Sequence, residues 1–89
     1  MIEKKIAIQN KLGLHARAAS VFVNVAQEFA SEITVTNTHS SANGKSIMKM
    51  MMLQAVIGSE IELRVEGEDE IDAMASLIQL IEKKFGEDE

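Results

Sequence analysis

The residues best suited to chemistry stand together in the run Gly13-Leu14-His15-Ala16-Arg17. A neutral imidazole such as that of His15 can act as a nucleophile and then carry a phosphoryl group. Arg17 adds a permanent cation whose planar fork matches the geometry of a phosphate. Gly13 allows a sharp backbone bend and the close approach of a partner. Each of these residue types has a role in phosphohistidine chemistry.

The place of His15, directly before a helical pattern, allows a second interpretation. Because His15 directly precedes the helix, the free N–H groups of the first turn should point toward its ring. The positive end of a helix binds anions and disfavours a protonated imidazole, which suits a histidine that is neutral when it acts as a nucleophile. A histidine near a helix start is more often a helix cap or a satisfied surface residue than a nucleophile, and His15 would then belong to a small α/β ligand-binding or interaction domain. A metal site is disfavoured because His39 is the only other histidine and the chain has no cysteine. We expect no metal and no cofactor.

The elements that must position His15 follow from hydrophobic periodicity. Alternation predicts a half-buried strand over 2–8, and Asn10, Lys11 and Gly13 then mark a loop. The helical period that follows predicts a helix over about 16–28. Its apolar stripe comprises Ala19, Phe22, Val23, Ala26 and Ala30.

The rest of the chain predicts three more strands and two more helices. The strands cover 32–36, about 40–43, and 60–66. Ser46 can cap a short helix over about 47–53, and Asp69 can cap a last helix that Gly86 stops. The buried stripe of that last helix is expected to be Ile71, Met74, Ala75, Ile78, Ile81 and Phe85. The acidic tail Glu87-Asp88-Glu89 is expected to fray.

This order, β-α-β-β-α-β-α, predicts an α+β fold in which helices cover one face of an antiparallel sheet. We expect one domain over 1–89 because the chain is too short for two cores.

Composition and charge exclude several classes of function. No apolar run approaches the roughly 20 residues that a membrane helix needs, and the first residues do not resemble a signal peptide. The absence of cysteine excludes disulfides, and we expect a cytoplasmic protein with no membrane insertion. Nucleic-acid binding is disfavoured because the net charge is −5 and only three aromatic residues are present. The charge is also split, since residues 1–54 carry +3 and residues 55–89 carry −8, which indicates a face that attracts an acidic partner.

Three motifs resemble those of HPr, the histidine-containing phosphocarrier of the bacterial phosphoenolpyruvate-dependent sugar phosphotransferase system. They are the run around His15, the run Lys45-Ser46-Ile47-Met48, and the segment from Glu66 to Ala73. The resemblance covers essentially the whole chain. It implies an open-faced β-sandwich, in which a four-stranded antiparallel sheet is covered on one face by three helices.

The resemblance also implies a function. His15 would accept a phosphoryl group on Nδ1 from Enzyme I and pass it to a sugar-specific Enzyme IIA, while Arg17 steadies the phosphate. The protein would then be a monomeric phosphoryl carrier, without the turnover of a free-standing enzyme. Helical spacing sends Met50 and Leu53 into the core. The expected docking residues are Ala16, Ser20, Ile47, Met48, Lys49 and Met51, with Lys11 and Lys45 completing a basic rim.

In family members controlled by an HPr kinase/phosphorylase, the serine that matches Ser46 is a regulatory phosphorylation site, which the helix dipole would tolerate. The sequence departs from the family at Ala18, where proline is usual, and at Gln54, where glycine is common. These departures leave an alternative open: an HPr-like protein of a nitrogen-related or catabolite-control branch that is not dedicated to sugar uptake.

Overall fold

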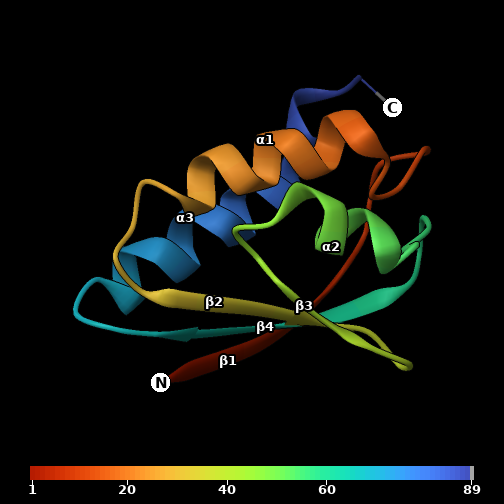
Figure 1. Cartoon of the computed structure of the whole chain (residues 1–89). Coiled ribbons are helices and arrows are strands. Elements are labelled where there is room, and N and C mark those ends of the chain that lie inside the picture. Colours follow the sequence, from red (N-terminus) through yellow and green to blue (C-terminus); the bar gives the residue numbers. More distant parts are fainter. Residues whose placement is uncertain (89) are drawn as a thin grey trace.

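The computed structural model describes residues 1–88 and follows the expected order of elements (Figure 1). Four strands form one sheet in the order β1-β4-β2-β3, with every neighbouring pair antiparallel. Three α-helices lie over one face of this sheet, so the expected open-faced sandwich is confirmed (Figure 1). The strands are β1 (Ile2–Ala7), β2 (Glu32–Thr36), β3 (Ser41–Asn43) and β4 (Glu60–Glu66). The helices are α1 (Ala16–Ala26), α2 (Ile47–Met52) and α3 (Glu70–Glu82), and a 3-10 turn, η1 (Lys84–Gly86), follows α3.

The central strand β4 shows why the sheet has one buried and one open face. Its inward side chains Ile61, Leu63 and Val65 are almost completely buried, whereas Glu60 and Arg64 are exposed. Successive side chains of a strand point to opposite faces, so this alternation places all three apolar groups under the helices. No helix of residues 1–88 is long and apolar enough to span a membrane.

Helix α1 buries the face that the periodicity predicts, but it is shorter than expected. Phe22 and Ala26 are fully buried, and the helix ends at Ala26, about two residues early. Ala30 lies beyond that end and is exposed, so its place in the buried stripe was wrong. The chain has already left the helix there and is turning toward β2.

Helix α3 is rotated from the orientation that the sequence suggested. Ala73, Met74, Leu77 and Ile81 are buried, whereas Ala75 is exposed and Ile71 is 73% exposed. Bulky apolar residues suggested the stripe, but the small side chain of Ala73 faces the core. Ile71 instead lines a groove beside β1 with Ile2 and Lys4. Helix α3 also ends at Glu82, and Gly86 closes the 3-10 turn beyond it.

Asp69 occupies the N-cap position of α3 without capping it through its side chain. Its carboxylate accepts hydrogen bonds from the backbone N–H groups of Ala30 and Ser31, at 2.8 and 3.0 Å, and from the Ser31 hydroxyl. These bonds, the Ser31 hydroxyl first among them, hold the pKa of the Asp69 carboxyl below its usual range. Asp69 therefore joins the loop before α3 to the loop before β2.

The loop that carries His15 is held against the segment that follows α2. Leu14 N–H donates to the Ala55 carbonyl at 2.8 Å, and Gly58 N–H donates to the Ile8 carbonyl at 2.8 Å. Gly13 has a φ of +68°, and a Cβ at that position would collide with the Ala55 carbonyl oxygen. The close approach expected at Gly13 is therefore made by this chain's own backbone.

Replacing Asp69 with asparagine should lower the melting temperature by several degrees at neutral pH, because one amide oxygen cannot replace the two carboxylate oxygens that accept these bonds. Because folding lowers the pKa of Asp69, its contribution to stability is present above the unfolded-state value of about 3.9 and is lost as the pH falls through the folded-state value. Thermal unfolding between pH 7 and pH 2.5 should show the gap between wild type and Asp69→Asn closing in acid. The control Glu68→Gln changes an exposed carboxylate and should show no such gap.

Replacing Gly13 with alanine should lower the free energy of unfolding by about 2 kcal/mol or more, because a left-handed backbone strain and a collision act together. Gly58 is a matched control, since its φ is +84° but nothing lies within 4 Å of an added Cβ. Gly58→Ala should therefore cost only the strain, about 1 kcal/mol. Equal losses of stability for the two variants in urea unfolding would show that the Ala55 contact is unimportant.

Candidate functional site

His15 is the N-cap residue of α1, with an extended backbone and no hydrogen bond from its side chain to the first turn. The ring is 29% exposed. The interpretation of His15 as a side-chain cap is therefore wrong, and the ring is available for other contacts.

The contact that His15 does make comes from the far end of the chain. Its Nε2 lies 2.5 Å from Oε2 of Glu87, and the Glu87 side chain is 15% exposed. Oε1 of the same carboxylate accepts a hydrogen bond from Asn10 Nδ2 at 2.9 Å. Asn10 is fully buried and also donates to the Gly13 carbonyl at 2.8 Å. The tail was expected to fray, but at Glu87 it is tied to the histidine; Glu89 lies outside the described residues.

This arrangement favours a charged carboxylate at Glu87. The hydrogen bond from Asn10 lowers the pKa of Glu87, partial burial opposes it, and the contact with His15 and the charge of Arg17 lower it further. Glu87 and Asn10 are the site residues that the sequence did not reveal, since 72 positions separate Glu87 from His15. No local spacing connects them.

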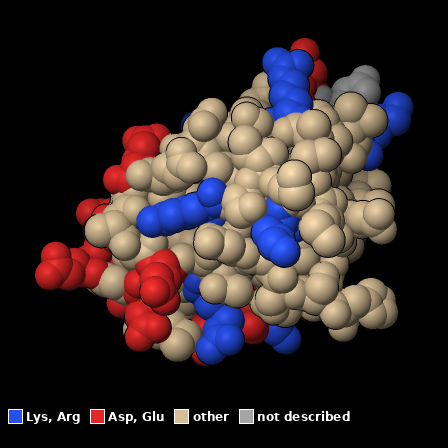
Figure 2. Space-filling view, viewed as in Figure 1, with Lys and Arg blue, Asp and Glu red and all other residues tan. Residues whose placement is uncertain are grey.

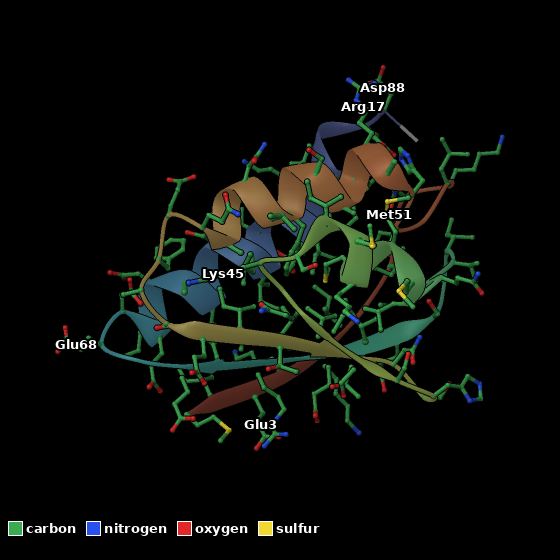
Figure 3. All side chains as sticks on the ribbon, in the orientation of Figure 1. Glu3, Arg17, Lys45, Met51, Glu68 and Asp88 are labelled. Atoms are coloured by element: carbon green, nitrogen blue, oxygen red, sulfur yellow. The ribbon has the colours of Figure 1, made fainter. Side chains whose placement is uncertain are left out.

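Arg17 and His15 line one surface cavity of about 420 Å³, as the sequence suggested. Figure 3 shows Arg17 beside Asp88, above the start of α1 and next to the end of the chain. Arg17 is exposed on the first turn of α1. The other lining residues are Lys11, Leu12, Gly86, Glu87 and Asp88. A guanidinium and an imidazole therefore open onto the same space at the start of an 11-residue helix, and the carboxylates of Glu87 and Asp88 share that space.

Helix α2 presents the second part of the candidate site. Ser46 caps it as expected, accepting a hydrogen bond from Lys49 N–H at 3.3 Å. Met50 and Leu53 are buried, and the three side chains expected to face outward do so: Met48 is 72% exposed, Ile47 and Met51 41% each. Met52, at 65% exposed, adds to them. A shallow depression is lined by Ile47, Met48, Met51, Met52 and Gln54.

The charge around this apolar surface is uneven. Figure 2 shows a largely uncharged area over α1 and α2, with a few basic side chains and with acidic side chains gathered at the left edge. Glu68 marks that acidic edge in Figure 3. Of the other expected docking residues, Lys49 and Ala16 are exposed and Ser20 is partly buried. Lys45 does not extend the basic rim outward, because its Nζ donates to the Phe29 carbonyl at 2.6 Å.

The two departures from the family pattern have simple structural settings. Ala18 is fully buried in the first turn of α1, where an alanine side chain fits against the core. Gln54 adopts a left-handed backbone with φ of +52°, which explains why glycine suits this position. Neither residue contacts His15 through a described hydrogen bond, and residues 1–88 contain no cluster of three or more acidic, histidine or cysteine residues that could hold a metal.

Comparison with known proteins agrees with this geometry. A family model described as the PTS HPr component phosphorylation site matches residues 2–83. Phosphocarrier protein HPr of Neisseria meningitidis serogroup A is 52% identical over 89 residues, covering 100% of both chains. Phosphocarrier protein HPr of Pseudomonas aeruginosa is 48% identical over 86 residues, covering 96% of each chain.

A solved structure gives the same result for the fold. The crystal structure of HPr-C-His from Thermoanaerobacter tengcongensis superposes with a TM-score of 0.95 at 46% identity, covering 100% of both chains. Because the curated relatives are named phosphocarriers, these matches do not favour the regulatory alternative. The chain belongs to the HPr family of phosphocarrier proteins of the phosphotransferase system.

Proposed function

We propose that this protein carries a phosphoryl group on His15 between Enzyme I and a sugar-specific Enzyme IIA. The Nδ1 lone pair attacks phosphorus, the N–P bond of the phosphohistidine on Enzyme I breaks, and its electron pair returns to the departing imidazole. In the second transfer a nucleophile on Enzyme IIA breaks the new N–P bond, and His15 recovers its lone pair. After the two transfers the protein has returned to its starting state, as a carrier does.

The observation that carries this proposal is the shared space of His15, Arg17 and the N-terminus of α1. The first N–H groups of an α-helix have no partners within the helix, and the helix dipole places partial positive charge there. Arg17 adds a full charge on the same side. A phosphoryl group on Nδ1 would therefore lie near backbone donors and the Arg17 guanidinium, in a cavity that Glu87 and Asp88 also line, and Arg17 is the residue suited to steady it.

We assign docking of both partners to the apolar surface of α2 and the neighbouring residues of α1. Flexible thioethers adapt to different partner surfaces, which suits a carrier that must bind a donor and an acceptor in turn. The docking set comprises Ala16, Ser20, Ile47, Met48, Lys49 and Met51. The exposed cation of Lys49 and that of Arg17 favour partners with acidic surfaces. We expect the carrier to act as a cytoplasmic monomer.

Ser46 is proposed as a second, regulatory phosphorylation site for an HPr kinase/phosphorylase. Its hydroxyl already meets the first turn of α2, where the helix dipole would tolerate a phosphate of about −2 charge. That charge would stand at the edge of the docking surface and repel an acidic partner. Phosphorylation of Ser46 would thus weaken docking without touching His15.

Mass spectrometry after incubation with Enzyme I and phosphoenolpyruvate tests the carrier function. The wild-type protein should gain one acid-labile phosphoryl group, His15→Ala none, and the control His39→Ala one. Incubation with an ATP-dependent HPr kinase should add an acid-stable phosphate that Ser46→Ala abolishes. Normal labelling of His15→Ala by Enzyme I would refute the assignment of His15.

Replacing Met48 with alanine tests the docking surface. Truncating a central apolar contact should raise the KM for phosphorylation by Enzyme I about 10-fold with little change in kcat. The melting temperature should stay the same because Met48 is largely exposed. Ile71→Ala is the matched control, since Ile71 is equally exposed but lines the separate groove beside β1. An equal rise in KM for both variants would argue against docking at α2.

A further inference from the structure

The donor and the acceptor of each hydrogen bond around His15 can be assigned in turn, starting from a backbone carbonyl group that can only accept. The Gly13 carbonyl can only accept, so the Asn10 atom 2.8 Å from it must be the amide nitrogen, Nδ2. The second hydrogen of that nitrogen points to Glu87 Oε1, 2.9 Å away. Turning the amide over would set Oδ1 against both the Gly13 carbonyl and the carboxylate. The orientation of Asn10 therefore follows from the backbone.

The orientation of the Asn10 amide leaves its oxygen without a hydrogen-bond donor in the described part of the chain. Within residues 1–88 no donor reaches Asn10 Oδ1, although the residue is completely buried. A buried acceptor without a partner is unfavourable because it has lost its hydrogen bonds to water. The two bonds from Nδ2 must offset that cost. The carboxylate of Glu87 is thereby held in place by a donor that itself cannot turn.

The direction continues from Glu87 to the histidine ring. A charged carboxylate only accepts, so the short contact between Oε2 and Nε2, 2.5 Å, requires the proton to be on Nε2. A neutral ring with its proton on Nε2 has its lone pair on Nδ1. We infer that Glu87, held by Asn10, is a positioning residue that sets the tautomer of His15 and so makes Nδ1 the nucleophile.

The same contact has a consequence for the phosphorylated protein. When Nδ1 forms its bond to phosphorus, the Nε2 proton stays, and the ring becomes cationic. Glu87 then faces a full positive charge at Nε2, and the hydrogen bond becomes an ion pair. This inference rests on the proposed acceptance of the phosphoryl group by His15 and specifies how the ring is prepared for it.

Two substitutions at Glu87 separate hydrogen-bond direction from charge. In Glu87→Gln the amide oxygen remains opposite the Asn10 donor, which leaves the NH₂ group facing Nε2. That donor requires an unprotonated Nε2 and moves the proton to Nδ1, where it blocks the nucleophile. In Glu87→Ala the charge is also lost, but the ring is left to sample both tautomers. A purely electrostatic role predicts equal effects for the two variants, whereas control of the tautomer predicts that Glu87→Gln is the more impaired.

The test combines a spectroscopic and a kinetic measurement. Long-range ¹⁵N–¹H spectra of the protein alone, at a pH where the rings are neutral, should show the proton of His15 on Nε2 in wild type, on Nδ1 in Glu87→Gln, and on both nitrogens in Glu87→Ala. The exposed His39 serves as an internal reference. The kcat for phosphorylation by Enzyme I should fall about 10-fold in Glu87→Gln, less in Glu87→Ala, and not in the control Glu82→Gln, with KM unchanged throughout.

The outcomes distinguish this inference from the carrier function itself. Wild-type labelling with mixed tautomers at His15, or equal kcat values for Glu87→Gln and Glu87→Ala, would overturn the role of Glu87 and leave the carrier function standing. A fixed Nε2–H tautomer without any labelling of the wild type would overturn the carrier function instead. Thermal unfolding of each variant confirms that the folded protein is compared in every case.

Discussion

The geometry of the site depends on the contact between the backbone at Gly13 and the Ala55 carbonyl. This contact presses the loop that begins at the end of β1 against the segment that leaves α2, and the bond from Leu14 N–H to the same carbonyl secures it. This carbonyl group links the two parts of the candidate site, together with the packing of α1 against α2. The ring of His15 on α1 and the apolar surface of α2 are held as one unit because their supporting loops cannot separate without losing this packing.

Periodicity and capping chemistry were enough to predict the fold. Glu32–Thr36 and Glu60–Glu66 are observed with the expected bounds because strict alternation with one buried face leaves a single register. Ser46 was recognisable because a cap acts over three residues. The burial of Ala73 in α3 was not, since a small residue gives a weak hydrophobic signal. Its buried position depends on how closely the helix can approach its neighbours, which is a tertiary property.

In the candidate site, too, some residues could be predicted from the sequence and others could not. His15 is the N-cap residue of α1 and Arg17 stands two positions later in its first turn, so a local pattern could place them together. Glu87 and Asn10 could not be found like this, because Glu87 follows η1 and reaches Asn10, in the loop before α1, only in the folded chain. Asp69 shows the same limit: its position predicted a cap, but the donors of Ala30 and Ser31, brought near by folding, take its carboxylate. Residues that act through contacts between distant parts of the chain have no characteristic spacing in the sequence by which they could be predicted.

The structure fixes the orientation of the reacting group but leaves the side chains of the docking surface free to change conformation. The ring of His15 is approached by a carboxylate whose own partner is a completely buried amide, so its direction is tightly determined. The side chains of Met48, Met51 and Met52 are exposed, unbranched and able to repack. A carrier with two partners needs both properties, because the phosphoryl acceptor must be identical in each encounter while the contact surface must adapt. Because α1 and α2 pack directly against each other, the fixed ring and the adaptable side chains are presented to a partner on one continuous surface.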